Sequence, residues 1–318
     1  QYSYPCNVAN SFIIYNRNVF DKYGIPYPPE DLTWDKYIEL AKALTIPGAR
    51  DRTVPEVFGA AGVDDRIIVW EMGADFLNKD GTRSGLNDSR FLDAMVFLHD
   101  LYFRHNIEPT KVQQVGVNTQ GGWGGGGYIS WLGEEKLGMY WGSRWMLIQL
   151  RRFKDDQKKA VEKWEASHPG EKYAGPKMLR LGACLLPRFS DRPRYSGFDA
   201  RCTAINADTK NRDGSLKFLQ YLASREYCEI INKGADSKPG NMAYYTIEEF
   251  TNPDYPGEEQ IHEMSIKSID YSRLPPMSPF ITYAVMNRHY RIALDKITTD
   301  EKGTMGRDGI ALILKETS

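Results

Sequence analysis

The sequence has little of what marks nucleic-acid binding, membrane insertion or export. Among 318 residues, 41 basic side chains face 42 acidic ones, for a net charge of −1, so nothing indicates a nucleic acid or an anionic membrane as partner. No apolar run approaches the ~18 residues of a membrane-spanning helix. Residues 1–5 show neither the basic nor the apolar region of a signal peptide. With 41% hydrophobic and 26% charged residues, the composition is that of an ordinary globular protein.

Motifs of common metal and nucleophile sites are missing as well. No CxxC pair occurs, so we expect neither a zinc ribbon nor a thioredoxin-like site. His262-Glu263 lacks the second histidine of HExxH, and there is no GxSxG nucleophile elbow. We therefore expect no metal and no cofactor. The cysteines allow three pairings in an oxidising compartment, but we expect free, buried thiols at all four: Cys6, Cys184, Cys202 and Cys228.

Residues 121–127 are rich in glycine and formally satisfy GxGxxG. In a run of glycines this match is nearly automatic, and Trp123 inside it is unsuited to a pyrophosphate turn. Residues 112–120 also make a poor preceding strand. We interpret the stretch as an extended loop near a cleft and not as a nucleotide site.

Predicted strands and helices alternate along the chain, which indicates an α/β fold. A chain of 318 residues is too long for one small core and most naturally makes two lobes. Hydrophobic periodicity and turn signals predict strands at residues 12–16, 57–61, 137–141, 179–186 and 201–206. The same signals predict helices at residues 17–23, 34–44, 67–73, 88–105, 128–132, 146–153, 213–231, 246–250, 257–267, 279–297 and 307–315, with a solvated charged face over 151–163.

One stretch, residues 136–147, joins a buried strand to a helix through a tight turn. Its apolar run at 137–141 suits a buried strand, and Gly142-Ser143 permits the turn. The turn delivers Arg144 and Trp145 to the end of the strand, where a cleft can receive them. From spacing alone, the plainer interpretation is that Trp145 plugs the core.

Five stretches carry a characteristic order of motifs. The most specific is YNRNVF at 15–20, followed by YGIP, PP, TW and AKALT up to residue 45. The others are GADFL with DG at 73–81, GM with GSRW at 138–145, a series of short matches over 187–224, and PPMSPF at 275–280. In this order the chain resembles family 1 extracellular solute-binding proteins of ABC importers, the sugar-binding kind, over essentially its whole length.

The resemblance implies an α/β fold of the periplasmic-binding-protein-like type II, with two lobes joined by hinge crossings. Residues 1–195 and 240–318 would build the C-terminal lobe, and residues 196–239 would be a retained segment of the N-terminal lobe. Family members usually carry a long segment and an export signal before the YN motif, so we expect most of the first lobe to be absent here.

The function implied by the resemblance is non-catalytic capture of a sugar, by hinge closure, for an ABC importer. The partners would be the sugar or another polar solute and the permease subunits, with no nucleic acid. The protein would be a monomer in the periplasm or a cell-surface lipoprotein. The sequence leaves the identity of the solute open.

The resemblance also points to ligand-binding residues. Trp145 stands at the family's G-x-W aromatic and is the expected platform for the apolar face of a sugar. Arg144 beside it would meet a hydroxyl or an anionic group. The further candidates lie in the 64–66 loop, after the hinge-adjacent glycine, or at the start of the helix after the last crossing: Asp64, Asp65, Arg66, Phe198, Asp199, Phe280 and Tyr283. The plainer interpretations are a surface arginine at 144, a solvated turn at 64–66 and core packing for Phe198.

Two other classes of protein stay open at this stage. A glycoside hydrolase needs a sugar cleft with paired carboxylates, which Glu134-Glu135, Asp64-Asp65 and Glu71 can supply. With 42 acidic residues such pairs are common, and nothing in the sequence marks one as desolvated. A structural or adhesion module would show no affinity for sugars.

Overall fold

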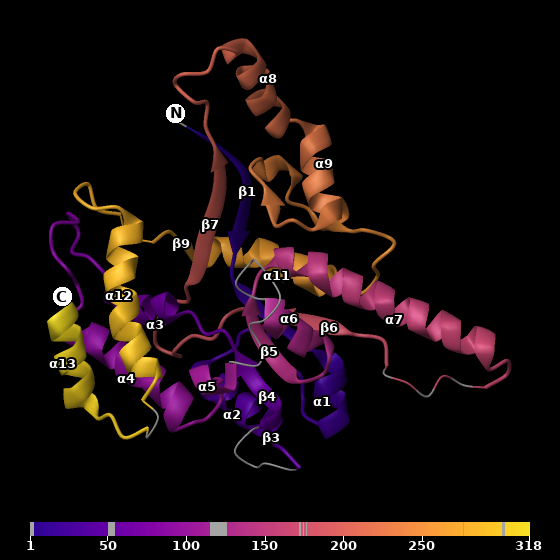
Figure 1. Ribbon diagram of the computed structural model, residues 1–318, viewed down its shortest axis with the longest axis horizontal. Coiled ribbons are helices and arrows are strands. Elements are labelled where there is room, and N and C mark those ends of the chain that lie inside the picture. Colours follow the sequence, from indigo (N-terminus) through magenta and orange to yellow (C-terminus); the bar gives the residue numbers. More distant parts are fainter. Residues whose placement is uncertain are drawn as a thin grey trace.

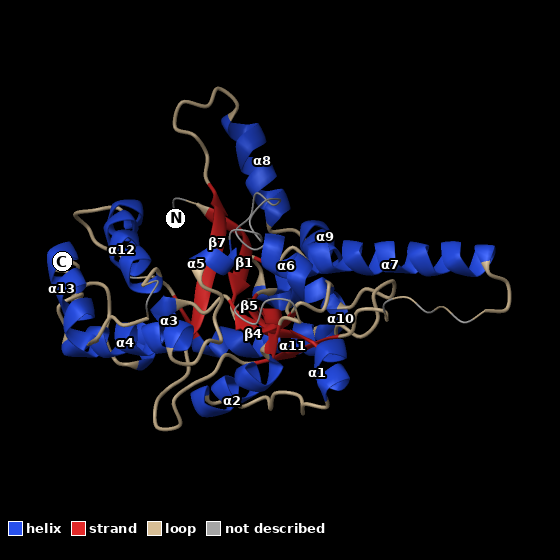
Figure 2. Ribbon diagram, turned by 60° about the horizontal axis from the view of Figure 1, so that its bottom comes forward, coloured by secondary structure: helices blue, strands red, loops and turns tan. Residues whose placement is uncertain are grey.

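The computed structural model describes residues 3–49, 55–114, 126–171, 173, 175, 177–275, 277–300 and 303–318. The fold is α/β, as predicted, with one five-stranded and one four-stranded sheet in the part of the chain described (Figures 1 and 2). The predicted glycine-rich loop lies almost wholly outside these residues.

The five-stranded sheet forms the centre of the body. Strand β2 (Phe12–Asn16), which lies between β5 and β6, is antiparallel to both neighbours, whereas β4 runs parallel to β5. Every residue of β2 is buried, because helices cover both faces of the sheet, and this is why its sequence, FIIYN, shows no polar alternation. In spatial order the strands are β3 (Ile46–Pro47), β4 (Pro55–Ala61), β5 (Leu137–Gly142), β2 and β6 (Leu181–Cys184).

Alternate side chains of β2 enter two separate hydrophobic clusters. Ile13 and Tyr15 join one cluster, and Phe12 and Ile14 join the other. The first cluster is built with α1 (Arg17–Tyr23), α2 (Trp34–Leu44), α3 (Asp65–Glu71), α4 (Ser89–Phe103), α12 (Tyr283–Thr298) and α13 (Arg307–Thr317). The second is built with α6 (Gly126–Gly133), α7 (Leu147–Ser167) and α11 (Glu259–Lys267).

The second sheet is a ribbon that rises from the body. Strands β1 (Tyr4–Asn10) and β7 (Ser196–Thr203) pair antiparallel along most of their length, and only Ser11 separates β1 from β2. Two short strands flank them, β8 (Lys238–Pro239) beside β1 and β9 (Ser272–Arg273) beside β7. Figure 1 shows α8 (Arg212–Leu222) at the far end of this ribbon and α9 (Arg225–Gly234) beside the ribbon, leading back toward the body.

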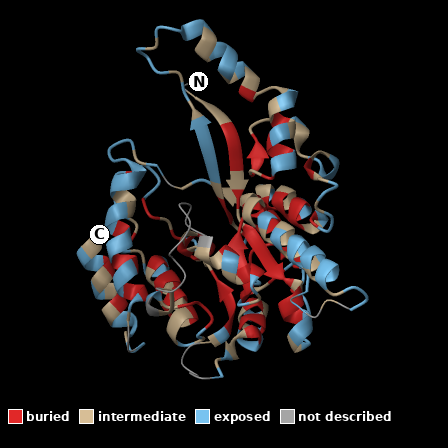
Figure 3. Cartoon of the chain, turned by 45° about the vertical axis from the view of Figure 1, so that its right-hand side comes forward, coloured by how far each residue is buried: buried red, intermediate tan, exposed pale blue. Residues whose placement is uncertain are grey.

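The helix at the far end of the ribbon, α8, buries little surface. In α8 the only buried residue is Leu222, and Figure 3 shows this end of the molecule mostly exposed or half-buried. The outer half of α7 is also exposed and projects from the body, in agreement with its predicted charged face (Figure 1). The remaining short elements are α5 (Lys111–Gln114), η1 (Arg144–Met146), η2 (Met242–Tyr244), α10 (Ile247–Phe250) and η3 (Ser268–Tyr271).

Several predicted elements differ from the structure. The long helix expected at 213–231 is two helices, because Ser224 interrupts it and caps α9 by accepting from the amide of Tyr227 at 3.3 Å. The helix expected from residue 279 begins at Tyr283, after an N-cap at Thr282. The strand expected at 201–206 starts earlier, at Ser196, and β1 was not predicted. The cysteines are free thiols, as expected, but Cys202 is exposed.

Gly59 provides a test of how α2 packs on the sheet. A Cβ at Gly59 would lie 1.8 Å from the carbonyl oxygen of Ala41, which is backbone and cannot move aside. We expect Gly59→Ala to lower the free energy of unfolding by ~1–3 kcal/mol. The measurement is urea unfolding followed by circular dichroism.

Gly234→Ala in α9 is the matched control for this prediction. No heavy atom lies within 4 Å of a Cβ at Gly234. Because alanine favours helix over glycine, we expect the control to be neutral or slightly stabilising. Equal stability of both variants would show that α2 does not rest on Gly59.

Candidate functional site

A polar cleft of about 590 Å³ opens where β4, β5, β7 and α12 approach one another. The loop after β4 forms one wall, α12 forms another, and η1 closes the end of β5. The lining residues are Gly62, Val63, Asp64, Asp65, Arg66, Phe76, Tyr140, Trp145, Asp199, Tyr283, Met286, Asn287, Tyr290 and Arg291.

The first wall begins with a turn that requires glycine. Gly62 has φ +87°, and a Cβ there would lie 2.6 Å from Cε2 of Tyr140. The amide of Gly62 donates to Oε2 of the buried Glu108 at 2.9 Å. The hydroxyl of Tyr37 donates to the other oxygen of Glu108 at 3.4 Å, and Nε1 of Trp141 donates to that hydroxyl at 3.1 Å. The turn is thus fixed by hydrogen bonds that reach into the core.

The two acidic residues of the loop have different environments. Asp64 caps α3 by accepting from the amide of Arg66 at 3.0 Å, and its Oδ2 lies 2.6 Å from Nη2 of Arg66. Asp65 is buried and accepts a hydrogen bond of 2.5 Å from the hydroxyl of Tyr290. Burial and the charge of Asp64 raise the pKa of Asp65. The half-exposed Asp64–Arg66 pair faces the cleft, whereas Asp65 ties α3 to α12.

The aromatic side of the cleft consists of rings with partly exposed faces. Trp145 is half-buried in η1 and packs against the second core cluster, and Tyr283 at the start of α12 is exposed. A ring face supplies the apolar surface that C–H groups prefer. The nearby carboxylates and guanidinium can satisfy hydroxyls that become buried. The cleft is therefore chemically suited to a polar molecule with one apolar face.

The structure brings most of the predicted site residues together and separates three of them. The predicted residues that line this cleft are Asp64, Asp65, Arg66, Trp145, Asp199 and Tyr283. Phe198 precedes Asp199 on β7, is half-buried and does not line the cleft. Phe280 is 71% exposed and lines a neighbouring apolar hollow of about 550 Å³, which meets the cleft at Tyr283.

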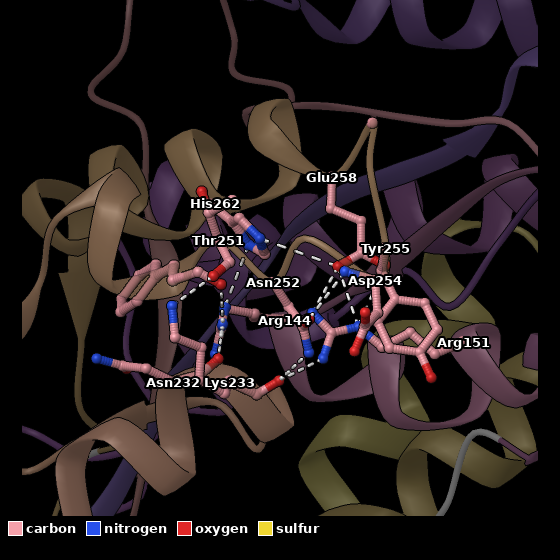
Figure 4. A network of polar contacts seen from close by, with 12 residues as sticks. Arg144, Arg151, Asn232, Lys233, Thr251, Asn252, Asp254, Tyr255, Glu258 and His262 are labelled. Atoms are coloured by element: carbon pink, nitrogen blue, oxygen red, sulfur yellow. Dashed lines mark hydrogen bonds and ion pairs between the residues drawn. The ribbon is translucent and has the colours of Figure 1, made fainter. Parts of the chain in front are cut away.

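Arg144 was expected to contact the ligand, but the structure does not place it in the lining of the cleft. Arg144 has no exposed surface and its guanidinium points away from the cleft into a buried network (Figure 4). Consecutive residues of a 3₁₀ turn are rotated by a third of a turn, so Arg144 and the adjacent Trp145 cannot face the same side.

Sequence reasoning named Tyr283 but missed the other residues that α12 contributes, and it missed Tyr140 of β5. Tyr283, Asn287 and Arg291 lie four residues apart on α12, so they share one face of the helix and all three line the cleft. That spacing is visible in the sequence, but nothing in it shows which face of the helix meets the cleft. Tyr140 was expected to be buried in its strand, and its ring reaches the cleft only because Gly62 leaves room for it.

Two further findings concern the described residues only. No group of three or more His, Cys, Asp or Glu side chains there is placed to hold a metal ion. Among the same residues, no helix is long and apolar enough to cross a membrane.

Comparison with known protein families shows which family the chain belongs to. The family described as bacterial extracellular solute-binding protein matches residues 2–227, which is more than half of the chain. The chain belongs to this family. No curated protein matches the sequence.

Solved structures of solute-binding proteins share the fold at low sequence identity. The ABC substrate-binding protein Lmo0181 from Listeria monocytogenes, in complex with cycloalternan, aligns with a TM-score of 0.71 and 16% identity over 100% of this chain and 71% of its own. Maltose-bound MalE3 of T. maritima aligns with a TM-score of 0.64 and 16% identity over 99% of this chain and 72% of its own. A sugar transporter protein of Rhizobium etli in an open conformation gives a TM-score of 0.64 and 16% identity over 99% and 71%.

The stability of this solute-binding protein is expected to depend on pH through Glu108, which lies beneath the cleft. Burial raises the pKa of Glu108 from 4.5 to about 8. Between these pH values the folded state binds more protons than the unfolded state. The contribution of protonated Glu108 to the free energy of unfolding is therefore complete below pH 4.5 and is lost as pH rises to about 8. Glu108→Gln keeps the shape and cannot ionise. We therefore expect its free energy of unfolding to fall less than that of the wild type between about pH 5 and about pH 8.5.

Urea unfolding at the two pH values measures this difference. Glu39→Gln on the exposed surface of α2 removes the same charge and is the control. If Glu108→Gln and the wild type lost stability in parallel, Glu108 would not carry the dependence.

Proposed function

We propose that this solute-binding protein captures a sugar or oligosaccharide for an ABC importer and does not transform it. The observation that carries the proposal is the cleft itself, because the ring of Trp145, the Asp64–Arg66 ion pair and polar residues of α12 all line the same cavity. A pyranose offers an apolar C–H face to the ring and a rim of hydroxyls to the charged groups. Solved proteins of this fold that contain maltose and cycloalternan support the choice of ligand class.

The ribbon of β1 and β7 supports a two-lobed receptor that closes on its ligand. Asp199 reaches the cleft from β7, so one of the strands that leave the body also forms part of the site. We propose that residues 1–195 and 240–318 form one lobe and that residues 196–239 belong to the other. A bend of this ribbon would then close the cleft.

Two of the three carboxylates of the cleft are engaged by protein groups, which supports binding without catalysis. Asp64 is held in an ion pair with Arg66 and Asp65 is buried beneath the hydroxyl of Tyr290, which leaves Asp199 as the third carboxylate of the lining. A glycosidase needs one carboxylic acid and one carboxylate that both face the scissile bond. No observation favours the hydrolase alternative.

A panel of sugars tests the proposal. Maltose, maltotriose, tagatose and galacturonate are screened by thermal shift, and each one that stabilises the protein is measured by titration calorimetry. We expect at least one to raise the melting temperature and to be recovered unchanged. If none stabilised the protein, or if one were cleaved, the receptor proposal would fail.

Trp145→Ala tests the aromatic platform. Loss of the ring removes the apolar surface on which the sugar stacks, so we expect the affinity for the best sugar of the panel to fall about 10- to 100-fold, which is ~1.4–2.8 kcal/mol. Trp164→Ala is the matched control, because Trp164 is also half-buried but lies on the projecting half of α7, against His168. Wild-type affinity in Trp145→Ala would contradict the role of the platform.

A further inference from the structure

The buried guanidinium of Arg144 lies one residue before the proposed platform and is bound by three separate segments (Figure 4). Nη1 donates to the carbonyl of Ser237 at 2.5 Å. Nη2 donates to the carbonyls of Asn232 and, at 3.3 Å, Phe250. Nε faces Nδ1 of His262 at 3.3 Å, and the guanidinium lies 4.3 Å from the centre of the Phe250 ring.

These contacts offset the cost of burying a charge. Asn232 lies in the last turn of α9 and Phe250 ends α10, so Arg144 binds carbonyls at two helix C-termini, where the helix dipole favours a cation. Burial and the nearby Arg151 lower the pKa of Arg144 to about 9, which leaves it charged at neutral pH. Burial and the surrounding cations lower the pKa of His262 to about 3, so its ring is neutral and can accept from Arg144.

Among the side chains of residues 143–146, Arg144 is the one that makes hydrogen bonds. Ser143 precedes η1 at the N-cap position but makes no capping hydrogen bond, and its buried hydroxyl has no partner. The turn is three residues long and runs directly into α7 at Leu147, and the amide of Met146 donates to the carbonyl of Ser143 at 3.1 Å. Arg144 is the polar side chain that ties this turn to other segments.

The carbonyls that hold Arg144 come from the segment that returns along the ribbon. Ser237 directly precedes β8, and β8 pairs with β1 through Asn7↔Pro239 and Val8↔Lys238. Arg144 therefore connects the turn at the end of β5 with a strand of the crossing ribbon. A movement of that strand displaces the carbonyls on which the turn depends.

We propose that Arg144 is a positioning residue, which fixes the ring of Trp145 and couples it to the crossing strand β8. The inference rests on the proposed function, because it is the sugar platform that Arg144 positions. It does not contact the sugar.

Arg144→Lys tests the positioning role. Lysine keeps the charge but has one terminal nitrogen, so it cannot reach three carbonyls and His262 at once. We expect the affinity for maltose, or for whichever sugar of the panel stabilises the protein most, to fall at least about tenfold. In the Trp145→Ala background the same substitution should change affinity less than about twofold, because the ring that Arg144 positions is already gone.

Arg151→Lys is the matched control. Arg151 is also buried, its Nη2 lies 2.7 Å from Oε2 of Glu258, and its Nη1 donates to the carbonyl of Lys233 at 2.6 Å. It follows η1 by more than one helical turn and therefore should not set the ring of Trp145. We expect Arg151→Lys to lower stability as Arg144→Lys does, but to leave the affinity within about twofold of wild type.

A readout without sugar separates this inference from the proposed function. In fluorotryptophan-labelled protein, the fluorine resonance of Trp145 is assigned by its loss in Trp145→Phe. We expect Arg144→Lys to shift and broaden that resonance, and Arg151→Lys to leave it in place. An unchanged resonance in folded Arg144→Lys would overturn the positioning role, whatever the sugar affinity. If the resonance shifted but no panel sugar bound even the wild type, the positioning role would stand and the proposed function would fall.

Discussion

The burial of two arginines beside the end of β5 is the constraint on which the arrangement of this molecule depends. A buried charge is tolerated only when its hydrogen bonds are complete. Arg144 takes its partners from the end of α9, the start of β8 and the end of α10, and Arg151 takes Glu258 and the carbonyl of Lys233. No single segment can satisfy either group. The chain that leaves the body through β7 must therefore come back so that the carbonyls of Asn232, Ser237 and Phe250 reach Arg144.

The same constraint links the two sheets. A single residue, Ser11, separates β1 of the ribbon from β2 of the five-stranded sheet, and α8 at the far end of the ribbon buries only Leu222. Lys238 of β8 is buried as well and donates to Oγ of Ser265 on α11 at 3.2 Å. The ribbon is thus held to the body at one end by buried polar contacts and is exposed at the other. In the proposed receptor, this ribbon is the segment that would bend when the two lobes close.

Local signals in the sequence were enough to predict the body of the protein. The bounds of β2, α1 and α2 follow from an apolar run, a cap at Thr33 and a glycine stop at Gly24, each of which acts over a few residues. Strand β1 was missed because Asn7 and Asn10 interrupt its apolar pattern, and they are buried only through contacts with distant segments. The side chain of Asn10 donates to the carbonyl of Ser265, far away in the sequence. Such partners leave no local pattern.

The candidate site divides in the same way. The loop at 64–66 and Trp145 were named as site candidates from the family resemblance, because spacing alone favoured core packing for Trp145 and a solvated turn at 64–66. The sequence could not show which way each of two neighbouring side chains points. Whether Arg144 or Trp145 faces the cleft depends on the segments that pack around the turn. Arginine beside a platform suggests a ligand contact, yet three backbone carbonyls and the absence of a cap at Ser143 draw it inward. In the proposed receptor, specificity would therefore come from side chains that line the cleft, such as Asp199 and the Tyr283–Asn287–Arg291 face of α12, and not from the arginine next to the ring.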